Sequence, residues 1–226
     1  MPRLKLPENN YPAGWFDGSC TRCPRLAGFL ADVREKEPDY YAAPVPPFGP
    51  ADAPLLLVGL APGMHGANRT GRPFTGDYAG LLLYRTLHKL GLASRPDSAQ
   101  PGDGLELIGC RISNAVKCLP PANKPTPAEI RCCQRWLGTE LAESRPKVVL
   151  ALGRIAHDAA LDACGARRSA HRFAHGAEHE LEEAHPRLVD SYHCSRYNTQ
   201  TRRLTESMFM DVVSRAARLA GVGSGA

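Results

Sequence analysis

The chain has 226 residues, of which 43% are hydrophobic and 23% charged, ordinary values for a globular protein with one sizeable core. Its net charge of +5 is a mild basic bias that permits a polyanionic partner without requiring one. No run approaches about 18 apolar residues, and residues 1–15 lack the apolar centre of a signal peptide, so we expect a cytoplasmic protein with no membrane partner.

Eight cysteines in such a chain favour metal or redox chemistry over structural disulfides. Residues 1–19 are punctuated by prolines and predict irregular structure. Cys20 and Cys23 then form a C-x2-C pair, and residues 25–36 predict a helix. Residues 37–53 hold five prolines and predict a connector.

The most informative stretch is residues 54–80. Leu55–Val58 is an apolar run too short for a helix and closed by Gly59, which is typical of a buried strand. The long glycine-rich loop that follows ends where a helix begins near Asp77 or Tyr78, so we expect free backbone N–H groups to face the loop. Loops longer than about 12 residues are usually functional or disordered, which favours a ligand-binding loop over a plain surface connection.

Three further strands are predicted, each followed by a loop and a helix. They cover residues 105–116, 147–152 and 187–192. A capping box, Thr126 with Glu129, predicts the start of the helix after the first of them. Residues 166–186, rich in His, Arg and Glu, predict a surface hairpin or short strands, and residues 201–221 a final amphipathic helix.

Strands that alternate with helices predict a parallel sheet covered on both faces. We therefore expect a single domain over residues 1–226, an α/β/α sandwich with a central, mainly parallel, four-stranded sheet. Residues 1–19 and 222–226 are expected to be irregular. The loops that carry polar groups all leave the carboxyl ends of strands, where ligands bind in such sheets.

The cysteines suggest one metal centre. Cys20 and Cys23 lie far in sequence from Cys118 and from the adjacent pair Cys132 and Cys133, and four thiolates from two such segments can hold zinc or an iron–sulfur cluster. Spacing alone does not separate zinc from iron–sulfur, nor Cys132 from Cys133. The remaining three are interpreted as buried small hydrophobic residues: Cys110, Cys164 and Cys194.

Several short motifs together resemble the uracil-DNA glycosylase superfamily. They are Gly59-Leu-Ala-Pro-Gly63, Gly71-Arg-Pro-Phe74, Asn114-Ala-Val-Lys-Cys118-Leu-Pro-Pro, and His193 at a strand end. The cysteine set resembles that of the iron–sulfur branches, families 4 and 5. Leu60 stands where family 4 has a glutamate, and the insertion at residues 64–70 and the sequence of residues 193–198 resemble family 5, the B-type thermophile glycosylases.

The resemblance implies a structural four-iron, four-sulfur cluster. Its ligands would be Cys20, Cys23, Cys118 and Cys133, the last preferred over Cys132 because, like the family 4 ligand, it lies four residues before a leucine, Leu137. The resemblance also implies a monofunctional enzyme of base excision repair that acts on DNA containing uracil or other deaminated bases, such as hypoxanthine or xanthine. We expect a monomer.

Three site residues are carried over from the family. Phe74 matches the residue that stacks on the flipped base, and Asn114 matches the amide that binds its Watson–Crick edge. His193 is suited to donate to the oxyanion of the leaving base. Gly59 and Ala61 belong to the same pocket.

Asp77 is assigned by position. The acidic residue that usually orients water is absent at Leu60 and Ala61, and Asp77 is the nearest carboxylate able to replace it. Cations near the loops are expected to bind phosphates, and Tyr197 with Arg196 to fill the space that the flipped nucleotide leaves. The predicted DNA-binding set comprises Arg69, Arg72, Lys117, Lys124, Arg196, Tyr197, Asn198, Arg202 and Arg203.

Each of these residues also has a plainer interpretation. Phe74 could belong to the core, Asn114 to a turn, and His193 to a structural hydrogen bond, while Asp77 could act only as a helix N-cap. The i, i+4 spaced His171, His175 and His179 are interpreted as solvated or pocket-lining residues rather than a metal site. The alternative functions are a family 4-like glycosylase restricted to uracil and a non-enzymatic iron–sulfur or zinc nucleic-acid-binding protein.

Overall fold

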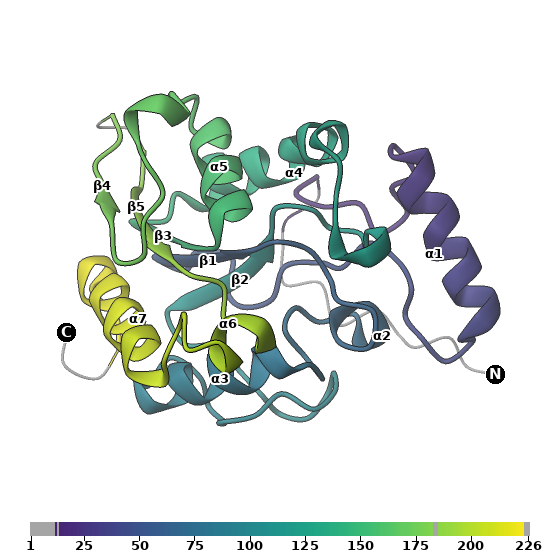
Figure 1. Ribbon diagram of the computed structural model, residues 1–226, viewed down its shortest axis with the longest axis horizontal. Coiled ribbons are helices and arrows are strands. Elements are labelled where there is room, and N and C mark those ends of the chain that lie inside the picture. The colour runs from purple at the N-terminus through teal and green to yellow at the C-terminus, as the bar shows by residue number, and fades with distance from the viewer. Residues whose placement is uncertain (1–11, 13, 183–184, 224–226) are drawn as a thin grey trace.

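A computed structural model describes residues 12, 14–182 and 185–223 of the chain. Its core is a five-stranded sheet of order β2-β1-β3-β5-β4, in which only β4 is antiparallel to its neighbour. Helices cover both faces (Figure 1), so the predicted α/β/α sandwich is confirmed. The strands are β1 Leu55–Gly59, β2 Cys110–Asn114, β3 Val148–Leu152, β4 Glu178–His179 and β5 Arg187–Ser191.

Seven α-helices and two short 3-10 helices are assigned among the described residues. The α-helices are α1 Pro24–Lys36, α2 Ala67–Thr70, α3 Tyr78–Lys89, α4 Pro127–Ser144, α5 Arg154–Ala163, α6 Arg196–Gln200 and α7 Glu206–Ala220. The 3-10 helices are Pro121–Asn123 and Arg168–Ala170. The predicted capping box at the start of α4 is present, with Thr126 accepting from the backbone of Glu129 and Glu129 accepting from that of Thr126.

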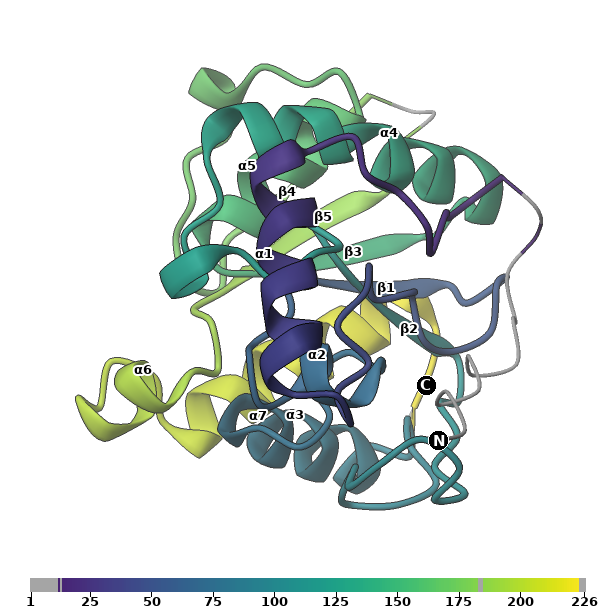
Figure 2. The same cartoon turned by 90° about the vertical axis from the view of Figure 1, so that its right-hand side faces the viewer.

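Alternation along β1 divides the core into two layers. Leu55 and Leu57 belong to the cluster that α3 and α7 cover, whereas Leu56 and Val58 belong to the cluster under α4 and α5. Both faces are buried because both carry helices, which explains why the strand is a continuous apolar run. A third cluster packs α1 against the segment after β2 and against α4, and Figure 2 shows α1 running across this end of the molecule.

The predicted elements differ from the structure at three places. The sheet has five strands rather than four, because two residues of the His-rich segment, Glu178 and His179, pair with β5. The strand predicted over residues 105–116 is limited to β2, and Leu107 makes only an isolated bridge to Ala93. The final helix begins at Glu206, because residues 201–205 form a turn between α6 and α7.

The irregular ends are tested only in part. Residues 14–19 contain turns and no helix or strand, whereas residues 1–11, 13 and 224–226 lie outside the described residues. Residues 37–53 are a connector, as predicted, although Phe48 makes one antiparallel bridge to Ile112. No helix in the part of the chain that the structure describes is long and apolar enough to cross a membrane.

Candidate active site

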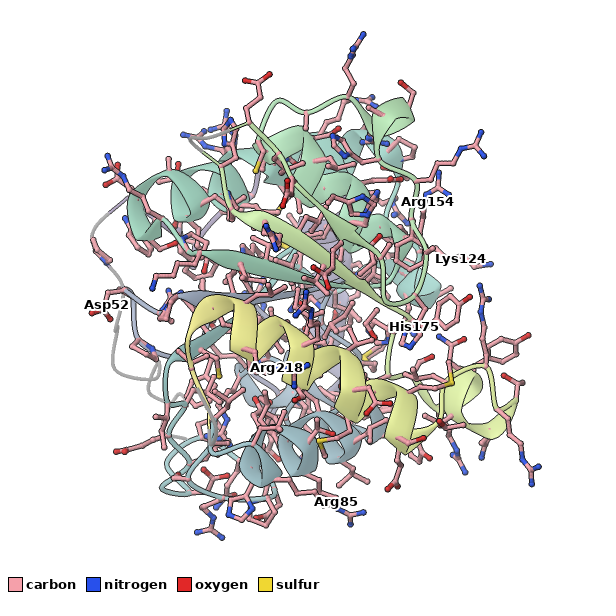
Figure 3. All side chains as sticks on the ribbon, turned by 90° about the vertical axis from the view of Figure 1, so that its left-hand side faces the viewer. Asp52, Arg85, Lys124, Arg154, His175 and Arg218 are labelled. Atoms are coloured by element: carbon pink, nitrogen blue, oxygen red, sulfur yellow. The ribbon has the colours of Figure 1, made fainter. Side chains whose placement is uncertain are left out.

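A cavity of about 570 Å³ opens at the carboxyl edge of the sheet. Its walls come from the loops after β1, β2, β3 and β5, as expected for a sheet of parallel strands. Five of the six predicted catalytic and base-binding residues line it, Ala61, Phe74, Asp77, Asn114 and His193, together with the predicted DNA-binding residue Arg196. In Figure 3, the labelled Arg154, Lys124 and His175 lie along this edge, while Asp52 lies at the opposite end of the molecule.

Phe74 and Asn114 line the cavity, and Gly59 lies directly against both side chains. Asn114 ends β2 and pairs with Gly59 at the end of β1. A Cβ atom at Gly59 would lie 2.5 Å from Asn114 Oδ1 and 2.7 Å from the ring of Phe74, so this position has no room for a side chain. Gly59 therefore contributes by letting the amide and the aromatic ring approach each other.

The backbone around Phe74 is unusual. Phe74 has a φ of +53°, a region that non-glycine residues seldom adopt. Its carbonyl oxygen would lie 1.8 Å from a Cβ atom at Gly80, so the first turn of α3 requires glycine there. The ring of Phe74 is buried but still lines the cavity. It serves the core and the site at once.

Asp77 is the N-cap of α3, and its Oδ1 accepts from the backbone N–H of Gly80 at 2.8 Å. Burial raises the pKa of Asp77 above its ordinary value of 3.8, and backbone hydrogen bonds oppose this shift. The loop after β1 covers the carboxylate closely, since a Cβ at Gly66 would lie 2.5 Å from Oδ2. Among the described residues that line the cavity, Asp77 alone carries a carboxylate.

His193 lines the same cavity from just beyond the end of β5. Its ring is stacked near that of Phe74, with 5.9 Å between centroids and 26° between planes. Burial lowers the pKa of His193 from 6.5 to about 4. The imidazole is therefore neutral at physiological pH and can donate one N–H without carrying a charge.

Three of the predicted DNA-binding residues lie at or near the mouth of the cavity with exposed side chains. Arg69 donates to the carbonyl of His65, and Arg196 lies over the ring of Tyr78. Lys124 is exposed in the loop after β2. Tyr197 is 71% exposed, which no packing requirement explains.

Arg72 is not available to DNA, contrary to the prediction. Its side chain is only 4% exposed and forms a bidentate ion pair with Asp103. Lys117 is also excluded, because it is buried beside Glu140 and Ser113. Both lie in glycine- or proline-rich loops whose sequence does not reveal a distant acidic partner.

The other predicted contacts are tied to the protein to different degrees. Asn198 donates its side-chain amide to the carbonyl of His193 at 2.8 Å, which makes it a support for the active-site loop. Arg203 lies over the ring of Tyr192, with 4.5 Å from its Cζ atom to the centroid. Arg202 is exposed.

Five thiols converge on a second, much smaller cavity next to α1. It is lined by Cys20, Cys23, Cys118, Cys132 and Cys133. The other three cysteines are buried elsewhere, as predicted: Cys110, Cys164 and Cys194. This donor set fits a cysteine-ligated cluster, which needs four thiolates in one place.

The electrostatics of these thiols also fit a bound cation. Burial, and then a hydrogen bond with Cys132 and the neighbouring thiols, raises the pKa of Cys23 to about 12. The pKa of Cys133 is raised by burial, and its Sγ accepts from the backbone N–H of Lys117 at 3.3 Å. Thiols crowded in this way stay protonated unless positive charge is placed among them, and a metal centre supplies it.

Comparison with known proteins gives a family match over this region of the chain. A model described as "Uracil DNA glycosylase superfamily" matches residues 46–217, which include the whole cavity described above. The chain belongs to the uracil-DNA glycosylase superfamily. Of the five thiols in the second cavity, Cys118, Cys132 and Cys133 lie within the matched region, whereas Cys20 and Cys23 lie before it.

Full-length relatives point to one branch of the superfamily. The chain is 52% identical over 211 residues to the type-5 uracil-DNA glycosylase of Thermus thermophilus, covering 90% of this chain and 95% of the relative. It is 42% identical over 228 residues to the type-5 enzyme of Pyrobaculum aerophilum, covering 96% and 99%. A type-4 uracil-DNA glycosylase of Archaeoglobus fulgidus matches at 34% over 139 residues, only 61% of this chain. The family 5 resemblance is confirmed.

Some residues of the glycosylase-like site were not predicted. Asn123 and the start of α5, Arg154 and Ile155, also line the cavity. Gly153 before α5 resembles the other strand-end glycines, and this signal could have identified the α5 start as a wall of the site. No comparable signal marks Asn123, which has a φ of +55°.

Proposed function

We propose that the chain is a DNA glycosylase that removes uracil from DNA by hydrolysis of the N-glycosidic bond. The observation that carries this proposal is the cavity itself, which combines an aromatic ring, a strand-end amide, a neutral histidine and a single carboxylate. An enzyme that acts on a base inside a duplex must extrude it into such a pocket and read its edge.

We assign a task to each side chain from its position in the cavity. Phe74 offers its ring to one face of the flipped base, and Asn114, held against Gly59, offers an amide to the Watson–Crick edge. His193 donates a neutral N–H to the base oxygen on which negative charge develops as the bond breaks. A neutral donor is suited to this task because it does not repel the cationic sugar.

The bond-breaking step separates charge. The electron pair of the C1′–N1 bond leaves with the base, and the sugar becomes an oxocarbenium-like cation that water attacks at C1′. Asp77 stabilises the cation and accepts the proton of that water. The apolar Leu60 and Ala61 on the same wall cannot do so, which leaves the task to Asp77.

We propose that Cys20, Cys23, Cys118 and Cys133 hold a four-iron, four-sulfur cluster, with which the five thiols of the second cavity are compatible. When bound, the cluster supplies a cross-link between the start of α1, the segment after β2 and α4. This cross-link stabilises the loop after β2, which begins at Asn114 and also carries Lys124. The reaction uses none of the cluster's own chemistry.

The substrate is proposed to extend to other deaminated bases, such as hypoxanthine and xanthine. The cavity of about 570 Å³ has room for a purine, and the amide of Asn114 does not by itself exclude one. The DNA partner is held by exposed cations at and near the mouth, Arg69, Lys124 and Arg196. We propose that the enzyme acts as a monomer.

A base-release assay on end-labelled duplexes containing uracil, hypoxanthine or xanthine tests the proposal. We expect strand breaks only after alkali treatment, because a monofunctional enzyme leaves an intact abasic strand. Asn114→Ala should lose roughly 10- to 100-fold in uracil release, since such a polar contact contributes about 1–3 kcal/mol, and less for hypoxanthine, which presents a different edge. Uncleaved uracil DNA after alkali would contradict the proposal and favour a non-enzymatic binding protein.

A further inference from the structure

Three titratable side chains beside the active site have no part in the reaction described above. His157 lies on the first turn of α5, Asp190 lies on β5, and His179 lies on β4. The side chains of His157 and Asp190 are 1% and 0% exposed, and that of His179 is 9% exposed. A charged group so buried is costly unless it is paired.

The hydrogen bonds of His157 define its protonation. Its Nδ1 lies 2.7 Å from Asp190 Oδ1, and its Nε2 lies 3.0 Å from the carbonyl oxygen of His171. A carbonyl oxygen can only accept, so Nε2 carries a proton. Nδ1 in turn faces a carboxylate oxygen, which accepts a hydrogen bond when it is ionised. Both ring nitrogens of His157 therefore face acceptors, which is the arrangement that an imidazolium ion requires.

Asp190 is saturated by its neighbours. Its Oδ2 lies 2.9 Å from His179 Nε2 and accepts a longer bond of 3.4 Å from the backbone N–H of Ala174. The rings of Phe173 and His179 pack against His157 at 5.6 and 5.2 Å between centroids. The predicted solvated or pocket-lining role is thus wrong for His179, which belongs to a buried ion pair.

A divalent metal ion is a weaker explanation of the same cluster. Ligand atoms around a tetrahedral zinc ion, each about 2.0–2.1 Å from the metal, lie roughly 3.3 Å from one another. The nitrogen–oxygen distances here are 2.7 and 2.9 Å, which are the distances of hydrogen bonds. Protons, rather than a metal, hold the three side chains together.

The ion pair connects the two elements that hold His193. Gly153, the N-cap of α5, lies one helical turn before His157 and donates to the carbonyl of Ser191 at 2.8 Å. A Cβ at Gly153 would lie 3.4 Å from the Cβ of His193, so the histidine packs directly on the start of α5. Asp190 lies on β5, three residues before His193 in the chain.

We propose that the His157–Asp190 ion pair, with His179 as its second donor, is a positioning device for His193. It fixes β5 against the first turn of α5, and so sets the place of the imidazole relative to Phe74 and the leaving base. The catalytic part of this inference rests on the proposed glycosylase function. The protonation of His157 does not.

The first test is single-turnover base release by Asp190→Asn. We expect a loss of roughly 10- to 100-fold for uracil, the scale of a small misplacement of a catalytic group, and a smaller loss for 5-fluorouracil, which leaves more readily. Adding Asp190→Asn to His193→Ala should lower the rate of uracil release little further than His193→Ala does alone. Equal losses for both bases, or losses that multiply in the double variant, would overturn the proposal.

Two variants control for damage to the fold. His157→Gln keeps a donor toward Asp190 but removes the charge, and should reproduce the leaving-group dependence of Asp190→Asn. Glu178→Gln removes an ion pair with Arg215 from β4, the strand that also carries His179, and should leave base release unchanged. If Glu178→Gln slowed base release as much as Asp190→Asn, any weakening of the β4 side of the sheet would be enough to slow the reaction. That result would overturn a specific role for the His157–Asp190 pair.

A measurement on the unaltered protein tests the ion pair independently of activity. Nitrogen-15 NMR of the histidine side chains at neutral pH should show His157 with a proton on both ring nitrogens. A single protonated nitrogen, or zinc at one ion per chain bound to these residues, would overturn the proposal. If the protein released no base at all, the proposed function would fail while this result still decided the state of His157.

Discussion

Replacing Asp77 by asparagine separates its two roles. The Oδ1 atom of Asp77 accepts from Gly80 N–H at 2.8 Å, and asparagine caps a helix about as well as aspartate. The free energy of unfolding should therefore change by less than about 0.5 kcal/mol. Loss of a positioned carboxylate should lower base release by roughly 10²–10⁴, or about 3–5 kcal/mol in activation free energy. Asp77→Ala should lose the cap as well.

The assay is single-turnover release of uracil from a labelled duplex, with DNA affinity and thermal unfolding measured on the same preparations. We expect Asp77→Asn to bind DNA and unfold like the unaltered protein while releasing uracil far more slowly. A rate within about threefold of the unaltered protein would refute the reasoning, because that change is below the effect of any positioned base. Asp77 would then be a helix cap alone, with the DNA phosphates and His193 sufficient for catalysis.

Three further predictions follow from the site. The rate of uracil release should fall as the pH decreases through the pKa of Asp77, which is raised above 3.8, and this decrease should be absent in Asp77→Asn. No inflection should occur near pH 6.5, because the pKa of His193 is about 4. Protein purified without oxygen should contain about four irons and four sulfides per chain, which Cys133→Ala should lose and Cys132→Ala should keep; zinc without sulfide would contradict the cluster. Arg72→Ala should lower the free energy of unfolding by about 3 kcal/mol, because it removes a buried guanidinium and its bidentate ion pair with the partly buried Asp103, whereas Arg196→Ala should weaken DNA binding and reduce its salt dependence without changing the melting temperature.

Continuous apolar runs allowed most of the sheet to be predicted. Leu55–Val58 and residues 147–152 can be buried on both faces only between two helical layers, so the α/β/α arrangement follows from the pattern. A hairpin or short strands were predicted within residues 166–186, but their pairing with the sheet was not, since Glu178 and His179 have no strand-like pattern. These two residues form β4 and pair with β5, and the side chain of His179 also bonds to Asp190, a contact between residues 11 apart.

The site residues also divide into those that could be predicted from the sequence and those that could not. Phe74, Asn114 and His193 follow strands whose carboxyl ends must meet, so their convergence was predictable from topology. Arg72 was assigned wrongly because its partner, Asp103, lies 31 residues away in a polar turn that has no distinguishing pattern. The ion pair of His157 and Asp190 was missed for a similar reason, since a histidine on a helix and an aspartate in a strand signal nothing until the fold joins them.

A crystal structure of Asp77→Asn bound to a duplex containing deoxyuridine tests the central claim most directly. It should show uracil out of the stack and in the cavity, with its ring on Phe74, its Watson–Crick edge at Asn114, and a ring nitrogen of His193 within hydrogen-bond distance of a base oxygen. Uracil that remains stacked in the duplex, or that occupies a site without these three side chains, would contradict the account.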